Sequence, residues 1–166
     1  MYRSLNDFLI SWEFEAKATS KILKNLNDES LSFEVAPHHW TLGRIAWHTV
    51  TSIKVISSQG DLSFEAPSED WSIPSSVDTI VESYDQSSNA FVEALKAQWT
   101  DESLLDQIDF FGQKMPKGSL LLFLNQHQTH HRGQITILMR QAGLSVPGIY
   151  GPSKEEWALM GMDAPK

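Results

Sequence analysis

Three histidines are the side chains of this sequence best suited to form one functional site. His127 and His131 lie four positions apart in the segment 125–134, NQHQTHHRGQ, and His48 lies far upstream in the segment 46–49, AWHT. Residues four apart share one face of an α-helix, so His127 and His131 can direct two imidazoles at one point. A third imidazole from a neighbouring helix would complete a three-nitrogen metal site with open positions, the layout of a catalytic or substrate-binding metal.

Such a site would supply a nucleophile at neutral pH. A metal held by three neutral imidazoles can lower the pKa of a bound water toward about 7, or bind a thiol as its thiolate. The chain contains no cysteine, which excludes disulfides, thiolate ligands and a cysteine nucleophile. Any metal must therefore be held by nitrogen and oxygen.

Four long amphipathic segments supply the helices that must position the histidines. Their apolar residues recur at steps of three and four, with Ser4 and Thr41 as caps of the first two and Gly60 and Gly143 as stops of the second and fourth. The expected helices span about 4–27, 41–60, 77–98 and 119–142. Four long helices predict an all-α four-helix bundle, in which metal and ligand sites are built from side chains on facing helices.

The connections between these helices are uneven in length. Residues 60–76 contain two prolines and several serines, which predicts an irregular crossover that lets the second and third helices run parallel. Ser76 is interpreted as a helix cap. The segment Gln107–Lys117 is either a hairpin or an ordered loop, and a short helix is expected at about Glu155–Met160.

The fourth helix carries a seam of alternating three- and four-residue steps, in which both histidines occupy leucine-like positions. The predicted seam is Leu120, Leu124, His127, His131, Gln134, Leu138 and Gln141. Gln134 is expected to bond an imidazole N–H or a bound ligand, with a register-fixing polar residue as the alternative. Arg132 is expected to point away from the core into a surface salt bridge. No carboxylate lies on the seam, so no built-in carboxylate base is expected.

The metal interpretation competes with that of ordinary core histidines. A lone histidine on an apolar face is more often a satisfied core residue than a ligand. Two adjacent imidazoles on a buried seam need polar partners at every nitrogen, and a shared cation meets that need. His130 is one residue out of phase, although local overwinding would let it replace His131. His38 and His39 lie in a loop and are not expected to be ligands; a role at the rim of the site is the less favoured interpretation.

Length and charge narrow the class of protein. The 166 residues fit one domain, 1–166, and 21 acidic against 13 basic residues give a net charge of -8. No run of Lys or Arg provides the basic surface of a nucleic-acid binder. No segment reaches the roughly 18 uninterrupted apolar residues of a membrane span. We therefore expect a cytoplasmic protein that binds neither nucleic acid nor membrane.

The joint pattern of these motifs is specific. His48 is followed by His127-x-x-x-His131-Arg132-Gly133-Gln134, by an apolar helix that ends in glycine, and by the segment 146–152, VPGIYGP. This pattern resembles the DinB/YfiT-like family of metalloenzymes, from about the first helix to Ser153.

The resemblance implies a four-helix bundle with an up-down-down-up order of helices. It assigns His48, His127 and His131 as ligands of a divalent metal, commonly nickel or zinc, with iron and manganese as alternatives. It also implies a homodimer. Some relatives transfer low-molecular-weight thiols such as bacillithiol or mycothiol onto electrophiles, and others isomerise or hydrolyse small molecules.

Three hypotheses follow for the function of the chain. The leading one is a metal-dependent transferase, of the thiol S-transferase type, or a hydrolase acting on a small molecule. The second is a non-catalytic, stress-related metal-binding protein in which the metal is structural. The third is a helical dimer whose histidines hold no metal. The candidates for aromatic residues at the site entrance are Trp40, Trp47, Tyr150 and Trp157.

Overall fold

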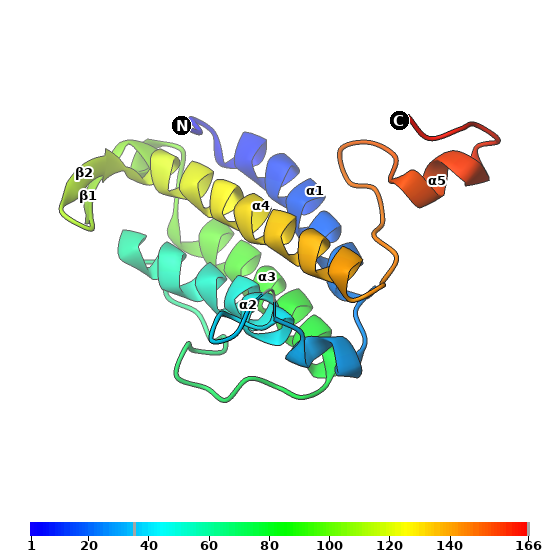
Figure 1. Ribbon diagram of the computed structural model, residues 1–166. Helices are drawn as coiled ribbons and strands as arrows, with labels where there is room; N and C mark the ends of the chain where they lie inside the picture. The colour runs from blue at the N-terminus through cyan, green and yellow to red at the C-terminus, as the bar shows by residue number, and fades with distance from the viewer. Residues whose placement is uncertain (35, 166) are drawn as a thin grey trace.

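Four long helices form a bundle in the computed structural model, which describes residues 1–34 and 36–165 (Figure 1). They are α1 (Leu5–Leu23), α2 (Leu42–Ser57), α3 (Val77–Gln98) and α4 (Lys117–Gln141). The helices α1 and α4 run in one direction and α2 and α3 in the other, as the chain colours show (Figure 1). The predicted four-helix bundle and its up-down-down-up order are confirmed.

The packing of neighbours explains how the histidines meet. The helix α2 packs against α3 and α4, and α1 packs against the same two helices, so α1 and α2 lie diagonally opposite. The parallel pair α2 and α3 needs a long connection, and the crossover between the short 3₁₀ helix η2 (Ser58–Gly60) and Val77 is irregular, as predicted. His48 on α2 therefore faces the neighbouring helix α4.

The end of α1 and the cap of α3 differ from the sequence prediction. The helix α1 ends at Leu23, short of the predicted Asn27, because Asn27 instead caps the 3₁₀ helix η1 (Asp28–Ser32) with a hydrogen bond from Ser30 N to its Oδ1 at 2.9 Å. At the start of α3, the Ser76 side chain makes no capping bond. The carboxylate of Asp28 takes that role, accepting from Val77 N at 2.7 Å.

The segment before α4 is a hairpin. Strands β1 (Gln107–Phe110) and β2 (Gln113–Pro116) pair antiparallel after the 3₁₀ helix η3 (Glu102–Leu105). The two turn residues, Phe111 and Gly112, both have positive φ, at 51° and 79°. A two-residue turn of this kind matches the right-handed twist of the flanking strands. The structure thus decides between the two alternatives that the sequence left open.

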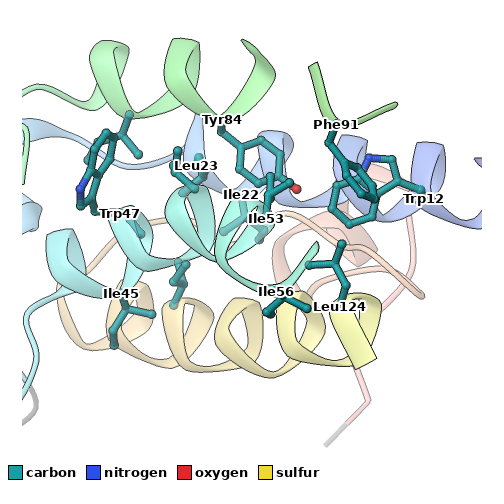
Figure 2. Close-up of a cluster of buried hydrophobic side chains, with 14 of the residues drawn as sticks. Trp12, Ile22, Leu23, Ile45, Trp47, Ile53, Ile56, Tyr84, Phe91 and Leu124 are labelled. Carbon is teal, nitrogen blue, oxygen red and sulfur yellow. The ribbon is translucent and has the colours of Figure 1, made fainter. Parts of the chain in front are cut away.

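The core draws large side chains from all four helices (Figure 2). The ring of Trp12 on α1 lies edge-on to Phe91 on α3, with centroids 5.0 Å apart. Ile53 of α2 and Leu124 of α4 are fully buried in the same core. Each such apolar side chain stabilises the fold by about 1.5–3 kcal/mol. The shared core holds α2 and α4 together.

The helix α4 is rotated relative to the predicted seam. Leu120, Leu124, His131 and Leu138 are buried, but Gln134 and Gln141 are exposed and His127 is half-buried. The least exposed polar side chains of α4 are Gln128, which is fully buried, and Arg132, which is 3% exposed. Both histidines therefore lie at the edge of the buried stripe and not at its centre.

The C-terminal segment forms the predicted short helix, α5 (Lys154–Leu159), capped by Ser153 and Glu156. Among the described helices, none is both long and apolar enough to cross a membrane.

Candidate metal centre

Three imidazoles converge where α2 faces α4. Nε2 of His127 lies 3.3 Å from Nε2 of His48 and 3.2 Å from Nε2 of His131. One ligand nitrogen from each of these residues lies within 4.8 Å of the others. The His48 side chain is 14% exposed and His131 is 9% exposed, so the cluster is largely screened from water.

The spacing of the nitrogens fits a metal ion. A tetrahedral ion bound at about 2.0–2.1 Å to three imidazole nitrogens separates them by about 3.3–3.4 Å. The distances of 3.2 and 3.3 Å around His127 are close to this value. Without a cation, a single N–H on Nε2 of His127 can serve only one of its two neighbours, since a neutral imidazole has one N–H.

Gln134 fixes the tautomer of His131. Its Oε1 lies 2.8 Å from Nδ1 of His131, and because a carbonyl oxygen accepts, Nδ1 carries the proton and donates. Nε2 of His131 then presents its lone pair to the centre of the cluster. Carbonyl partners of this kind commonly orient metal-bound histidines.

A carboxylate reaches the cluster from the crossover, contrary to the expectation that none would. Oε1 of Glu69 lies 3.2 Å from Nδ1 of His48, at ion-pair distance but outside the alignment of a hydrogen bond. The sequence prediction considered only carboxylates on the seam of the fourth helix. Glu69 lies in an irregular loop whose path no periodicity describes, so no sequence pattern signals this approach.

The third ligand candidate differs in its surroundings. Nδ1 of His127 is buried and has no hydrogen-bond partner among the described residues. An unpaired buried polar atom costs about 1–3 kcal/mol. His127 is therefore held in the cluster by the packing of α4 and by its two imidazole neighbours.

Burial keeps the imidazoles neutral. Desolvation lowers the pKa of His127 to about 4, helped by the like charge of protonated His131 and His48. Desolvation also lowers the pKa values of His48 and His131, against the opposing influence of Glu69 on His48 and of Gln134 on His131. Neutral imidazoles are the form that binds metal, so no proton has to be displaced near pH 7.

Arg132 points into the protein, and the prediction of a surface salt bridge is wrong. Its guanidinium donates to the Glu15 carboxylate, to Thr19 Oγ1 at 3.0 Å and to the hydroxyl of Tyr150. It thereby joins α4 to α1 and to the segment after α4. Arg132 directly follows His131 and therefore lies about 100° further around the helix. From there its long side chain reaches the core, where hydrogen-bond partners satisfy its donors.

The remaining candidates occupy distinct places. His130 is exposed, with its ring centroid 4.9 Å from that of His131, and it lies outside the cluster. The ring of Trp40 lies edge-on to His48, with centroids 5.2 Å apart. In contrast, Trp47 is 2% exposed and belongs to the core, and the hydroxyl of Tyr150 bonds Glu15 on α1. Of the aromatic residues predicted near the entrance, the structure places Trp40 beside a histidine of the cluster.

His38 and His39 line a pocket next to the cluster without joining it. The pocket holds about 610 Å³ and includes His131 and Gln134 in its wall. A larger pocket of about 860 Å³ lies between α1 and α3 and contains no histidine. The pocket next to the candidate metal centre is thus the smaller of these two pockets.

Comparisons with known proteins agree with this architecture. Residues 1–166 match the DinB family. The uncharacterized protein YrdA of Bacillus subtilis strain 168 is 63% identical over 166 residues, which are 100% of this chain and 99% of the relative.

Two solved structures are also similar. The crystal structure of a DinB-like protein from Bacillus cereus ATCC 10987 has a TM-score of 0.87 and 53% identity, and the match covers 90% of this chain and 100% of that one. The DinB-like protein YjoA of Bacillus subtilis has a TM-score of 0.67 at 17% identity, over 89% of this chain and 99% of its own, and shows the shared fold alone.

Proposed function

This chain belongs to the DinB family, and on that premise we propose that it binds one divalent metal ion through His48, His127 and His131. We further propose that it uses this ion as a transferase of the thiol S-transferase type, or as a hydrolase, on a small molecule. The observation that carries the proposal is the convergence of three Nε2 atoms from two helices, at 3.2 and 3.3 Å around His127.

The donor set favours particular ions. Three imidazoles without a thiolate suit zinc, nickel, copper and iron better than magnesium or calcium, which prefer oxygen. Nickel and zinc are our first candidates, and iron and manganese come second. The buried, neutral state of the three histidines supports binding near pH 7.

A bound divalent ion would lower the pKa of a water or a thiol at an open position. The chain's own residues then have positioning roles: Gln134 holds the His131 ring, and Glu69 faces Nδ1 of His48. With no cysteine in the sequence, the sulfur for a transferase must come from a low-molecular-weight thiol. Its thiolate would attack an electrophilic carbon, the thiol proton would pass to solvent, and the leaving group would depart with the electron pair of the broken bond.

Elemental analysis of protein purified without an affinity tag tests the metal site. We expect one divalent ion per chain, loss of the ion in His127→Ala, and retention in His130→Ala, whose imidazole lies outside the cluster. A thiol-conjugation assay with and without chelator then tests catalysis. Absence of metal from the purified protein, together with no uptake on titration, would overturn the proposal.

The alternative is a structural metal in a non-catalytic, stress-related protein. An ion on these ligands would cross-brace α2 and α4, because one ligand comes from α2 and two come from α4. That protein would be stabilised strongly against heat by metal, would lack a solvent-exchangeable ligand, and would turn over no pair of thiol and electrophile.

The proposed partners follow from the family and from the charge. We propose a cytoplasmic homodimer that binds neither nucleic acid nor membrane, in keeping with its net charge of -8. Light scattering should give about twice the chain mass of 18.7 kDa.

A further inference from the structure

A pocket of about 610 Å³ adjoins the histidine cluster, a size typical of small-molecule sites. It shares His131 with the cluster, so its interior begins at a candidate metal ligand. Besides His38 and His39, its described lining includes Trp40, Ile45, Gln134, Ile137 and Leu138.

Trp40 connects this pocket to a second histidine of the cluster. Its ring lies edge-on to the His48 imidazole at 5.2 Å between centroids, and the guanidinium of Arg44 lies 5.0 Å from the ring centroid. These contacts hold the indole beside the cluster. A molecule packed against Trp40 therefore lies next to both His48 and His131.

Apolar side chains make up half of the described lining of the pocket. Ile45 and Leu138 are buried, at 7% and 4% exposure, whereas Trp40 and Ile137 are 47% and 59% exposed and offer surface to a ligand. Among the described residues that line the pocket, none carries a carboxylate, ammonium or guanidinium group, and the guanidinium of Arg44 lies against the Trp40 ring. Such a wall favours a flat or branched apolar group and provides no counter-ion for a charged one.

One polar group on this wall has hydrogen-bonding capacity left. Oε1 of Gln134 is engaged by Nδ1 of His131 at 2.8 Å. No described residue accepts from Nε2 of Gln134, and the side chain is exposed on the pocket wall. This NH₂ group can donate to an acceptor on a bound molecule, next to His131.

We propose that this pocket binds the body of the substrate, and that this body is an uncharged aromatic or branched apolar group joined to a carbonyl-type acceptor. The apolar group packs on Trp40 and Ile137, and the acceptor oxygen takes a hydrogen bond from Nε2 of Gln134. This assignment rests on the proposed function in one respect: the reacting end of the same molecule would lie at the metal.

The larger pocket between α1 and α3 provides an internal reference. Its lining includes Lys17, Lys21, Lys24 and Lys96, each within 4.0 Å of a carboxylate. The residues that line this larger pocket include ammonium groups that can face an anionic probe, and the described residues that line the pocket beside Trp40 include none. Charge therefore separates the two pockets experimentally.

The test uses benzamide, benzoate and benzylamine, which are similar in shape and differ in charge. Each is titrated into the metal-free, chelator-treated protein and followed by amide chemical shifts, so that a metal cannot bind benzoate directly. We expect benzamide to shift the amides of 38–40 and 134–138 with a dissociation constant of about 1 mM, as expected for a fragment. Benzoate and benzylamine should bind these residues at least tenfold more weakly.

Two variants each replace an exposed isoleucine with aspartate, one inside the pocket and one outside it. Ile137→Asp places a carboxylate in the pocket, and Ile10→Asp places one on α1, where the side chain is 63% exposed. Ile137→Asp should weaken benzamide at least tenfold, and Ile10→Asp should leave it unchanged. Equal binding of benzoate and benzamide at these residues, or shifts confined to the pocket between α1 and α3, would overturn the assignment.

Metal titration of the same samples separates the two proposals. A protein that binds metal but shows no benzamide shifts at 134–138 refutes the pocket assignment and leaves the metal site standing. A protein that binds benzamide there but takes up no metal refutes the proposed function, while the pocket assignment is supported.

Discussion

Nε2 of Gln128 donates to the carbonyl oxygen of Thr49 at 2.8 Å. This bond joins the residue after His127 to the residue after His48, and the same amide group donates to Ser52 Oγ at 3.1 Å. Since Gln128 is fully buried, no water competes for these bonds. The side chain ties α4 to α2 next to the imidazoles and fixes the rotation of α4 that presents them.

Replacing Gln128 with methionine should therefore weaken both the fold and the metal site. The variant keeps the volume but leaves buried partners without a hydrogen bond, at a cost of about 1–3 kcal/mol. Metal affinity, measured by competition with a chelator, should fall because α4 is no longer held in phase. Tyr84→Phe is the control, since it removes a single bond to Gln128 at 3.3 Å. Unchanged affinity in the folded Gln128→Met variant would contradict a positioning role.

Arg132→Met should be strongly destabilising. It leaves the Glu15 carboxylate, which is 14% exposed, without its cation, and breaking a buried pair in this way costs about 3–5 kcal/mol. Urea unfolding should show the loss, with partial recovery in the double variant Arg132→Met/Glu15→Met. The half-exposed pair Arg140 and Glu155 offers a comparison, because Arg140→Met should cost less than about 1 kcal/mol. Equal costs at the two arginines would contradict the buried role of Arg132.

Glu69→Gln should weaken metal binding without affecting folding. Its carboxylate faces Nδ1 of His48 at 3.2 Å from an exposed loop position, and partners of metal-bound histidines contribute about 10–100-fold in affinity. Because the contact lacks hydrogen-bond alignment, we expect the lower end of that range. Glu65→Gln, an exposed change in the same crossover, should leave the affinity unchanged. The idea fails if both variants bind metal equally well.

The stability of the metal-free protein should fall as the pH is lowered from about 6.5 to about 4. Burial lowers the pKa of His127 to about 4 from an ordinary value of 6.5, and His48 and His131 shift in the same direction. Between these values the unfolded chain binds more protons than the folded one, so protonation favours unfolding. Metal affinity should decrease over the same range, because protons compete for the imidazoles.

Urea unfolding in the presence of chelator, at a series of pH values, measures this effect. His127→Gln should flatten the profile, since it removes the imidazole whose pKa burial lowers to about 4. A wild-type midpoint that stays constant between pH 7 and pH 4.5 would rule out buried, neutral histidines.

The rotation of α4 shows what helical periodicity can predict and what it cannot. The spacing of His127 and His131 predicts a shared face, and their nitrogens do meet, at 3.2 Å. The predicted seam nevertheless placed Gln134 and Arg132 wrongly with respect to the core. Leu121, Ile135 and Met139, all buried, lie in register with Gln128 and Arg132, so a wider apolar stripe was present in the sequence. Where the centre of this stripe lies depended on whether the side chains of Gln128 and Arg132 found hydrogen-bond partners in the core.

The sequence by itself determined the four helices, the irregular crossover and the meeting of His48 with His127 and His131. These features follow from local periodicity and from the few ways in which four amphipathic helices bury their apolar faces. Only the tertiary structure decided that Arg132 is buried and that Glu69 lies beside His48. It also decided that Trp40 and Gln134 line a pocket beside the cluster. Each depends on the path of a loop or on a partner distant in sequence, and short-range spacing contains no information on either.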